Sequence, residues 1–367
     1  MIYLTPSLNA TTKALLTRLD ALRAALGDSA AVTTPWLGRL RREWRASAAV
    51  SSIEIEGFHV PSDETVLLSS AQRLAVPGDE DRMALACYAR AMDHVGVMAD
   101  DPYFRWIDRV ILDLHFDACY FQKDKRPGRY RVGPVSVTSP RGNGLAYTGP
   151  PHEDVPELVS EVADWLANGD LDEHVVVRAA MAHLHLVSIH PFEDGNGRVS
   201  RIVQSLALAS LGLLAPELLS IEEYLGEHTD DYYAVLETVQ GGSYRPERDA
   251  GPWIEFCVQA HVDQAFRRSA QLAAAAKRWS FLEALVAQRG WPDRLVIALE
   301  QSLFHGVDRS SYVNEAQVSQ PTASNDLRRL LDAGLVVQHG SGPSTRYQAS
   351  AQLRDELRAD RHAWTSA

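Results

Sequence analysis

The chain has 367 residues, 46% hydrophobic and 23% charged, a composition ordinary for a globular protein with a substantial buried core. Its formal net charge of −12 argues against a protein whose main task is to neutralise nucleic-acid phosphates. Cys87, Cys119 and Cys257 lie far apart without paired spacing, so neither a disulfide framework nor a thiolate metal site is expected.

The start of the chain and its apolar stretches predict no secretory signal and no membrane span. A basic region followed by an apolar one is absent from the N-terminus. The longest nearly apolar stretch, 202–215, contains Gln204 and is too short to cross a bilayer, so it predicts a buried helix. Together with the cysteine pattern, this predicts a cytoplasmic protein that makes no membrane contact.

Helical periodicity dominates the first 276 residues. Leucines at helical spacing predict a first helix that ends near Gly27, and Pro35 precedes a second that ends at Gly57. Further helices are expected at 63–75, 79–98, 105–119, 153–167, 172–189, 196–212, 232–239 and 252–276. The segment 124–151 is rich in Gly, Pro and Arg, and its alternation at 135–137 predicts a loop with a small hairpin. The chain is therefore expected to be mainly α.

The pattern changes from about residue 279. Helices are expected at 280–288, 293–303 and 320–333, and strands at 335–337 and 345–347. Three helices followed by a β-hairpin resemble a winged helix.

The most informative run extends from His190 to Arg201 and reads HPFEDGNGRVSR. Two glycines flank Asn196 where a tight loop enters a helix, so backbone amides and the positive end of the helix dipole can face an anion. Arg198 and Arg201 are three residues apart and share a face of this helix. Their guanidinium groups suit the outer phosphates of a nucleoside triphosphate. The run therefore predicts a phosphate site.

Two further side chains bring chemistry to this site. Asp194, just before the loop enters the helix, offers the oxygen ligands that Mg²⁺ prefers. His190 precedes the loop, and a neutral imidazole there can accept a hydroxyl proton near neutral pH. A metal cluster of His183, His185 and His190 is an alternative. However, the first two point about 200° apart on a helix, which favours core or surface histidines.

The run resembles the signature of the Fic (Fido) family, His-Pro-Phe-x-Asp/Glu-Gly-Asn-Gly-Arg-x-x-Arg, and every specified position is present. The resemblance implies a protein adenylyltransferase, which carries out AMPylation by moving AMP from Mg²⁺ and ATP to a hydroxyl group of a target protein or of itself. Pyrophosphate is the implied leaving group.

The resemblance also implies a role for each residue of the run. His190 is the general base, Phe192 anchors the loop, and Asp194 holds the Mg²⁺ that bridges the α- and β-phosphates. The implied phosphate ligands are the loop residues Gly195, Asn196 and Gly197 and the side chains of Arg198 and Arg201. Glu193 occupies the variable position and is interpreted as a solvated charge.

The fold that the resemblance implies is a helical Fic core with a small β-hairpin flap, covering roughly residues 30–260. We therefore expect an N-terminal helical region at 1–100, a catalytic core at 101–276 and a winged-helix-like domain at 277–367. Residues 128–137 resemble the flap, whose edge could hold a segment of the target protein by main-chain hydrogen bonds. A purely structural hairpin is the alternative.

A second motif lies at 52–57, where Ser52 and Glu56 are four residues apart on one face of the predicted helix. This run resembles the inhibitory motif of Fic proteins, Ser/Thr-x-x-x-Glu-Gly/Asn. The resemblance implies that Glu56 pairs with Arg201 and blocks the seat of the γ-phosphate. An ordinary exposed glutamate near a helix end is the alternative. Some relatives use this glutamate to remove AMP from targets, and that reading stays open.

Several assignments remain open at this point. Tyr233 opens a helix that lies near the adenine in similar proteins, but core packing also suits it. Nothing in the motif selects the base, so transfer of UMP or phosphocholine is an alternative. From a different class, the chain could be a nucleotide-sensing transcriptional regulator that binds DNA.

The C-terminal segment 279–350 bears on that last alternative. It contains seven acidic and six basic residues, which is not a DNA-binding footprint. Its Arg328, Arg329 and Arg346 could still contact phosphates. We favour a protein-interaction role or formation of a homodimer.

Overall fold

The computed structural model describes residues 1–30, 35–60, 78–138, 145–210, 220–304 and 306–365. Within these residues the chain is built from helices and two antiparallel two-stranded sheets, so the expected mainly α fold is confirmed. The chain forms two compact units: unit 1 holds Met1–Asp28 and Arg41–Arg268, and unit 2 holds Ser29–Leu40 and Ser269–Ala367. The three-domain division stays a prediction, and the helix expected at 63–75 lies outside the described residues.

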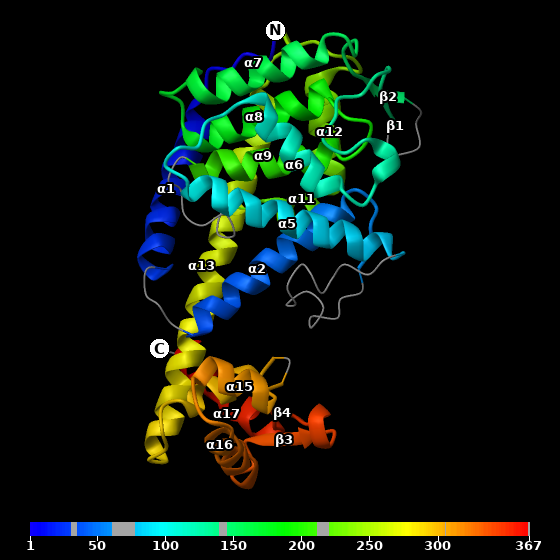
Figure 1. Cartoon of the computed structure of the whole chain (residues 1–367). Helices are drawn as coiled ribbons and strands as arrows, with labels where there is room; N and C mark the ends of the chain where they lie inside the picture. Colours follow the sequence, from blue (N-terminus) through cyan, green and yellow to red (C-terminus); the bar gives the residue numbers. More distant parts are fainter. Residues whose placement is uncertain (31–34, 61–77, 139–144, 211–219, 305, 366–367) are drawn as a thin grey trace. The chain divides into compact units, whose positions relative to one another are not determined.

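Most helices belong to unit 1 (Figure 1). The helices from the N-terminus to the end of this unit are α1 (Ala10–Ala30), α2 (Pro35–Glu54), α5 (Glu80–Asp100), α6 (Asp108–Cys119), the short η1 (Lys123–Lys125), α7 (Val155–Asn168), α8 (Val175–Ile189), α9 (Asn196–Ser210), α11 (Glu222–Glu227), α12 (Thr229–Gln240) and α13 (Gly251–Gln288). Both α2 and α13 continue across the boundary between the two units. No helix in the described residues is both long and apolar enough to cross a membrane.

The centre of unit 1 is the pair α8 and α9, which lie side by side (Figure 1). Residues 176–189 of α8 are buried on every side, and so are residues 198–208 of α9. Helices α5 and α6 pack against α9, and α7 packs against α8. Burial on all sides fits the largely apolar sequence of α8, whereas α9 also buries polar side chains, among them Arg198 and Arg201. The loop that joins them, 190–195, is therefore held between two immobilised helices.

Three helix ends differ from the sequence-based expectation. Helix α1 continues past Gly27, the expected stop, because a glycine inside a helix costs only about 1 kcal/mol. The expected helices 252–276 and 280–288 are one continuous helix, α13, since no proline or glycine interrupts residues 253–288. Helix α2 ends at Glu54, so Glu56 lies in the turn that follows and not in the last helical turn.

The hairpin of unit 1 consists of β1 (Ser136–Thr138) and β2 (Leu145–Thr148), which pair antiparallel. The expected strand at 135–137 is thus shifted by one residue. Thr148 also bonds on its other side, accepting from the Tyr244 amide at 3.1 Å and donating to the Gly242 carbonyl at 3.0 Å. The outer edge of β2 is therefore engaged at Thr148, whereas β1 pairs only with β2 among the described residues.

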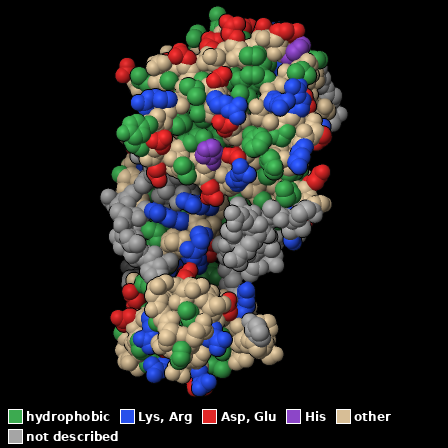
Figure 2. Space-filling model, viewed as in Figure 1, with side chains coloured by type: hydrophobic (Ala, Val, Ile, Leu, Met, Phe, Trp, Pro, Cys, Tyr) green, Lys and Arg blue, Asp and Glu red, His purple; other side chains and the backbone are tan. Residues whose placement is uncertain are grey.

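Unit 2 contains the C-terminal elements, which are α14 (Leu295–Ser302), α15 (Arg309–Ala316), α16 (Gln320–Asp332), β3 (Val336–His339), the short η2 (Gly342–Ser344), β4 (Arg346–Ala349) and α17 (Ala351–Thr365). Helix α15 was not anticipated from the sequence. Strands β3 and β4 form an antiparallel hairpin directly after α16, as expected. The arginines Arg328 and Arg329 are exposed, but Figure 2 shows Lys and Arg side chains scattered over the viewed face of this unit. The winged-helix assignment and DNA contact stay predictions.

Candidate active site

The loop between α8 and α9 is shaped by two residues with positive φ. His190 has φ 52° and ψ 59°, which ends α8, and its amide donates to the Leu186 carbonyl at 2.9 Å. Positive φ is uncommon for a non-glycine residue and draws attention to the position. Gly195 has φ +75°. The side chain of Asn196 then closes the loop, accepting from the Phe192 amide at 2.9 Å and donating to the Phe192 carbonyl at 3.0 Å.

Phe192 is fully buried and stacks on His115, with the two ring centroids 3.7 Å apart and the planes 5° from parallel. The Nδ1 atom of His115 accepts from the Gly128 amide at 2.9 Å, so Nε2 carries the proton and donates to the Asp194 carbonyl at 3.1 Å. Burial lowers the pKa of His115 to about 4, which keeps this ring neutral. His115 thus ties the segment before the hairpin to the motif loop, a role that the sequence did not indicate.

Two glycines of the motif allow close approach of other groups. A Cβ atom on Gly195 would lie 2.2 Å from the Cys119 sulfur, and one on Gly197 would lie 2.3 Å from Glu56 Oε1. Gly197 belongs to the first turn of α9, whose amides have no partner within the helix. The Glu56 carboxylate therefore lies against the helix end that favours an anion.

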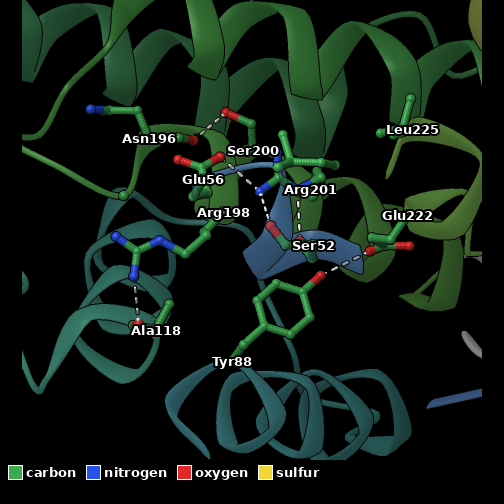
Figure 3. Close-up of polar contacts among 12 residues, drawn as sticks. Ser52, Glu56, Tyr88, Ala118, Asn196, Arg198, Ser200, Arg201, Glu222 and Leu225 are labelled. Atoms are coloured by element: carbon green, nitrogen blue, oxygen red, sulfur yellow. Dashed lines mark hydrogen bonds and ion pairs between the residues drawn. The ribbon is translucent and has the colours of Figure 1, made fainter. Parts of the chain in front are cut away.

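Arg201 reaches the turn after α2 and is 1% exposed (Figure 3). Its Nη2 lies 2.8 Å from Glu56 Oε1 and 2.8 Å from the Ser52 carbonyl, and its Nε donates to Ser52 Oγ at 2.7 Å. Although burial opposes the charged form, Glu56 and two tyrosines raise the pKa of Arg201. Its Nη1, buried beside Gly197, has no hydrogen-bond partner within the described part of the chain. An anionic oxygen beside the first turn of α9 would satisfy that donor.

Arg198 is fully buried and turns toward the end of α6 (Figure 3). Its Nη2 donates to Gln122 Oε1 at 2.9 Å and lies 3.5 Å from Asp194 Oδ1. Gln122 in turn donates through Nε2 to Asp194 Oδ2 at 2.6 Å. The Gln122 amide therefore bonds both the Arg198 guanidinium and the Asp194 carboxylate. Sequence reasoning did not identify Gln122, because nothing local distinguishes it from other polar residues after a helix.

The His190 ring is partly exposed and is arranged as a base. Its Nδ1 lies 3.2 Å from the Val187 carbonyl, which can only accept, so the proton resides on Nδ1 and Nε2 carries the free lone pair. Burial lowers the pKa of His190 below its ordinary value of 6.5. The imidazole is therefore neutral at pH 7 and able to take a proton.

Asp194 fits a Mg²⁺ ligand better than a member of a protein-only metal site. Its carboxylate is about one-third exposed, and the Gly195 amide bonds Oδ1 at 2.6 Å. No three His, Cys, Asp or Glu side chains gather as metal ligands among the described residues. Mg²⁺ commonly binds one or two carboxylates together with substrate phosphates, and a single carboxylate beside a phosphate site matches that habit.

The histidines of α8 belong to the core, as favoured from their spacing. His183 is fully buried, with Nδ1 at 2.7 Å from Gln204 Oε1 and Nε2 at 3.1 Å from the Tyr232 hydroxyl. His185 is buried beside the rings of Tyr3 and Trp165. Burial lowers the pKa of both histidines to about 3. Neither shares a metal site with His190.

The side chains of Tyr233 and Glu193 both contact residues outside the motif loop. The Tyr233 hydroxyl donates to the Ile55 carbonyl at 3.2 Å, so this side chain contacts the turn that carries Glu56. Its contact with adenine stays a prediction. Glu193 is exposed and lies 3.6 Å from Arg126, a loose surface pair consistent with a solvated charge.

The region that contains this site matches a known protein family. The Fic/DOC family model matches residues 103–208, which include α6, the hairpin, α8, the motif loop and most of α9. The chain is 30% identical over 233 residues to a protein named protein adenylyltransferase Fic from Aedes aegypti, covering 62% of this chain and 44% of that protein. The namesake from Culex quinquefasciatus is 38% identical over 233 residues, covering 62% and 43%. The chain thus spans less than half the length of these relatives.

Solved structures agree on the fold. A Fic family protein from Desulfovibrio desulfuricans G20 superposes with a TM-score of 0.60 at 22% identity, over 95% of this chain and 98% of that one. Fic-1 from Caenorhabditis elegans gives a TM-score of 0.55 at 21% identity, over 72% and 74%. The fold, the complete motif at the α8–α9 loop and the sequence relatives all indicate the same kind of domain. Residues 103–208 of this chain therefore form a Fic/DOC domain.

Proposed function

We propose that this chain transfers AMP from ATP to a hydroxyl group of a protein, and that Glu56 restrains the transfer. The observation that carries the proposal is the loop 190–201. Within twelve consecutive residues it carries a neutral imidazole, a partly exposed carboxylate and the amide-rich first turn of α9. The names of the sequence relatives support the same activity.

The chemistry needs one bond formed and one broken. The target hydroxyl oxygen attacks the α-phosphorus of ATP, and the bond from that phosphorus to the bridging oxygen of the β-phosphate breaks, which releases pyrophosphate. His190 Nε2 takes the hydroxyl proton, since Nδ1–H is held by the Val187 carbonyl. Amides of Asn196 and Gly197 and the unpaired Nη1 of Arg201 would stabilise phosphate charge.

Asp194 is the protein ligand that would hold Mg²⁺ at this site. Bound there, the ion would neutralise phosphate charge and favour departure of pyrophosphate. Gln122 and the Gly195 amide fix the orientation of this carboxylate. Substrate hydroxyls would approach along β1, which pairs only with β2 among the described residues and offers main-chain hydrogen bonds to an extended segment.

The restraint follows from the position of Glu56. Its carboxylate stands against Gly197 and bonds Arg201, where an outer phosphate of the nucleotide would otherwise lie. Two anions cannot share this place, because like charges a few ångströms apart repel strongly when buried. Transfer is therefore expected to be slow while Glu56 is seated.

The test uses intact-protein and peptide mass spectrometry. The wild-type protein and its Glu56→Gly, Glu54→Gly and His190→Ala variants are each incubated with ATP, Mg²⁺ and a cell lysate. Glu56→Gly is expected to add AMP to itself or to a lysate protein far faster than the wild type, and His190→Ala to add none. Glu54 is the exposed last residue of α2, two positions before Glu56, so Glu54→Gly controls for a weakened helix end.

A panel of UTP, GTP and CDP-choline in place of ATP separates AMP transfer from transfer of other groups. Absence of any adduct on Glu56→Gly, together with specific DNA retention by the protein, would instead favour a nucleotide-sensing regulator.

A further inference from the structure

The two motif arginines contact different parts of the segment 52–58, which comprises the last residues of α2 and the turn that follows. Arg201 bonds Ser52 and Glu56, as described above. The guanidinium carbon of Arg198 lies 5.3 Å from the centre of the Phe58 ring, and Phe58 stands two residues after Glu56. The segment 52–58 therefore contacts both arginines of the motif.

A second aromatic ring completes the surroundings of Arg198. The Phe121 ring centre lies 5.7 Å from the same guanidinium carbon. The two phenylalanine rings also meet each other edge to face, with centroids 5.7 Å apart and planes at 74°. Attraction between a cation and an aromatic face strengthens when the pair is removed from water, and Arg198 is fully buried.

Polar contacts hold the guanidinium in the same position. Arg198 donates to Gln122 and weakly to the Ala118 carbonyl at 3.4 Å, both at the end of α6. Its buried Nε has no hydrogen-bond partner within the described residues. Figure 3 shows Arg198 directed toward Ala118 and Arg201 directed toward Glu56. Arg198 is thus stabilised away from Glu56, with one donor unused.

We propose that Phe58 is a positioning residue of the nucleotide site, which together with Phe121 holds Arg198 at the end of α6. The segment 52–58 then restrains both motif arginines. Glu56 forms an ion pair with Arg201, and the ring of Phe58 makes a cation–aromatic contact with Arg198. This proposal rests on the proposed function, because it takes the outer phosphates of a nucleoside triphosphate as the ligand of Arg198. Phosphate binding draws Arg198 off the two rings.

The proposal has a consequence specific to the length of the phosphate chain. A triphosphate must recruit Arg198 and therefore works against the aromatic contact. AMP lacks the β- and γ-phosphates and leaves Arg198 where it is. Weakening the ring contact should tighten binding of a triphosphate and leave binding of AMP unchanged. A general loosening of the fold would alter both.

The experiment measures binding by calorimetry in the Glu56→Gly background, with Mg²⁺ present. The ligands are AMP and an ATP analogue whose α- and β-phosphates are joined by a methylene group, which cannot transfer AMP. Phe58→Leu keeps an apolar side chain without an aromatic face, and Phe58→Tyr keeps the face. We expect Phe58→Leu to tighten the Kd for the analogue about 2- to 10-fold, with the AMP Kd unchanged and Phe58→Tyr like the parent.

Phe121→Leu removes the other ring and is expected to act in the same direction. Thermal unfolding checks that each variant is folded, and if Phe58→Leu does not fold, Phe121→Leu decides. If Glu56→Gly binds the analogue but neither leucine exchange changes its Kd, the inference is wrong while the proposed function stands. An equal change for AMP also overturns it. If Glu56→Gly itself does not bind the analogue, both proposals fail.

Discussion

Arg131 donates a hydrogen bond through Nε to the backbone carbonyl of His190, 2.9 Å away. Its Nη1 donates to the Gly133 carbonyl at 2.7 Å, and its Nη2 to the Pro150 carbonyl at 2.6 Å. Gly133 precedes the hairpin and Pro150 follows it. One buried side chain therefore joins both ends of the hairpin to His190, the proposed base.

Replacing Arg131 should disturb stability and activity together. Arg131→Ala leaves three carbonyl groups, one buried and two partly buried, without their donors, for an expected loss of about 3 kcal/mol in the free energy of unfolding. Arg131→Lys should rescue little, because a single ammonium cannot reach three separated acceptors. Urea denaturation measures the loss. The exposed Arg129→Ala is the matched control, and a loss as large there would contradict the role assigned to Arg131.

Gly195→Ala should disable the motif loop. The backbone there has φ +75°, which costs a residue with a side chain about 1–2 kcal/mol. The new methyl group would also overlap the Cys119 sulfur. We expect loss of AMP transfer in the Glu56→Gly background, measured by mass spectrometry. Adding Cys119→Gly removes the overlap but not the strain, so rescue should be partial. Full activity of Gly195→Ala would refute this account of the loop.

The pH profile of transfer should reflect a base with a lowered pKa. Burial keeps His190 unprotonated to lower pH than an ordinary histidine, whose pKa is about 6.5. The kcat/KM of the Glu56→Gly variant should therefore be flat around neutral pH and fall only below about pH 6.5, as the imidazole is protonated. Rates at constant ionic strength from pH 5 to 8 measure this. An acid limb centred well above 6.5 would argue against His190 as the base.

Buried His185 should make the folded state sensitive to acid. Burial lowers its pKa to about 3, so below about pH 6.5 the unfolded chain binds a proton that the folded chain does not. His185 alone should then lower the free energy of unfolding as pH falls, by about 1.4 kcal/mol per unit between pH 6 and 4. His185→Leu should remove about 2 kcal/mol of the loss between pH 7.5 and 5. Urea titrations at both pH values test this, and an unchanged pH dependence would contradict it.

Much of the fold was predictable, because long periodic segments such as α8 and α9 carry strong signals. The errors have local causes. Nothing between 253 and 288 breaks a helix, so the sequence already allowed one continuous α13, and the expected interruption at 277–279 was wrong. Helix α15 was missed because its capping box is unusual. The N-cap Asp308 pairs reciprocally with Ser311 at the third helical position, where the usual motif has Glu or Gln.

The motif residues were identifiable from the sequence, but the residues that orient them were not. Gln122 lies 76 positions before Arg198, and Arg131 lies 59 before His190. Such pairs form only when α6 and the hairpin segment are brought against the α8–α9 loop. A single sequence carries no signal for which distant side chains meet. The placement of Phe58 also depends on the positive φ of Gly57, which turns the chain after α2.

The groups that contact the two motif arginines lie at the end of α2 and in the turn that follows it. Ile53 is fully buried and anchors the body of the helix, while Glu56 and Phe58 follow in a turn closed by the bond from the Phe58 amide to the Ile53 carbonyl. Helix ends open at far lower free energy than helix centres. Opening of this one turn would therefore release both arginines while Ile53 stays packed, so substitutions in residues 54–58 could change the proposed restraint without disturbing the core of the unit.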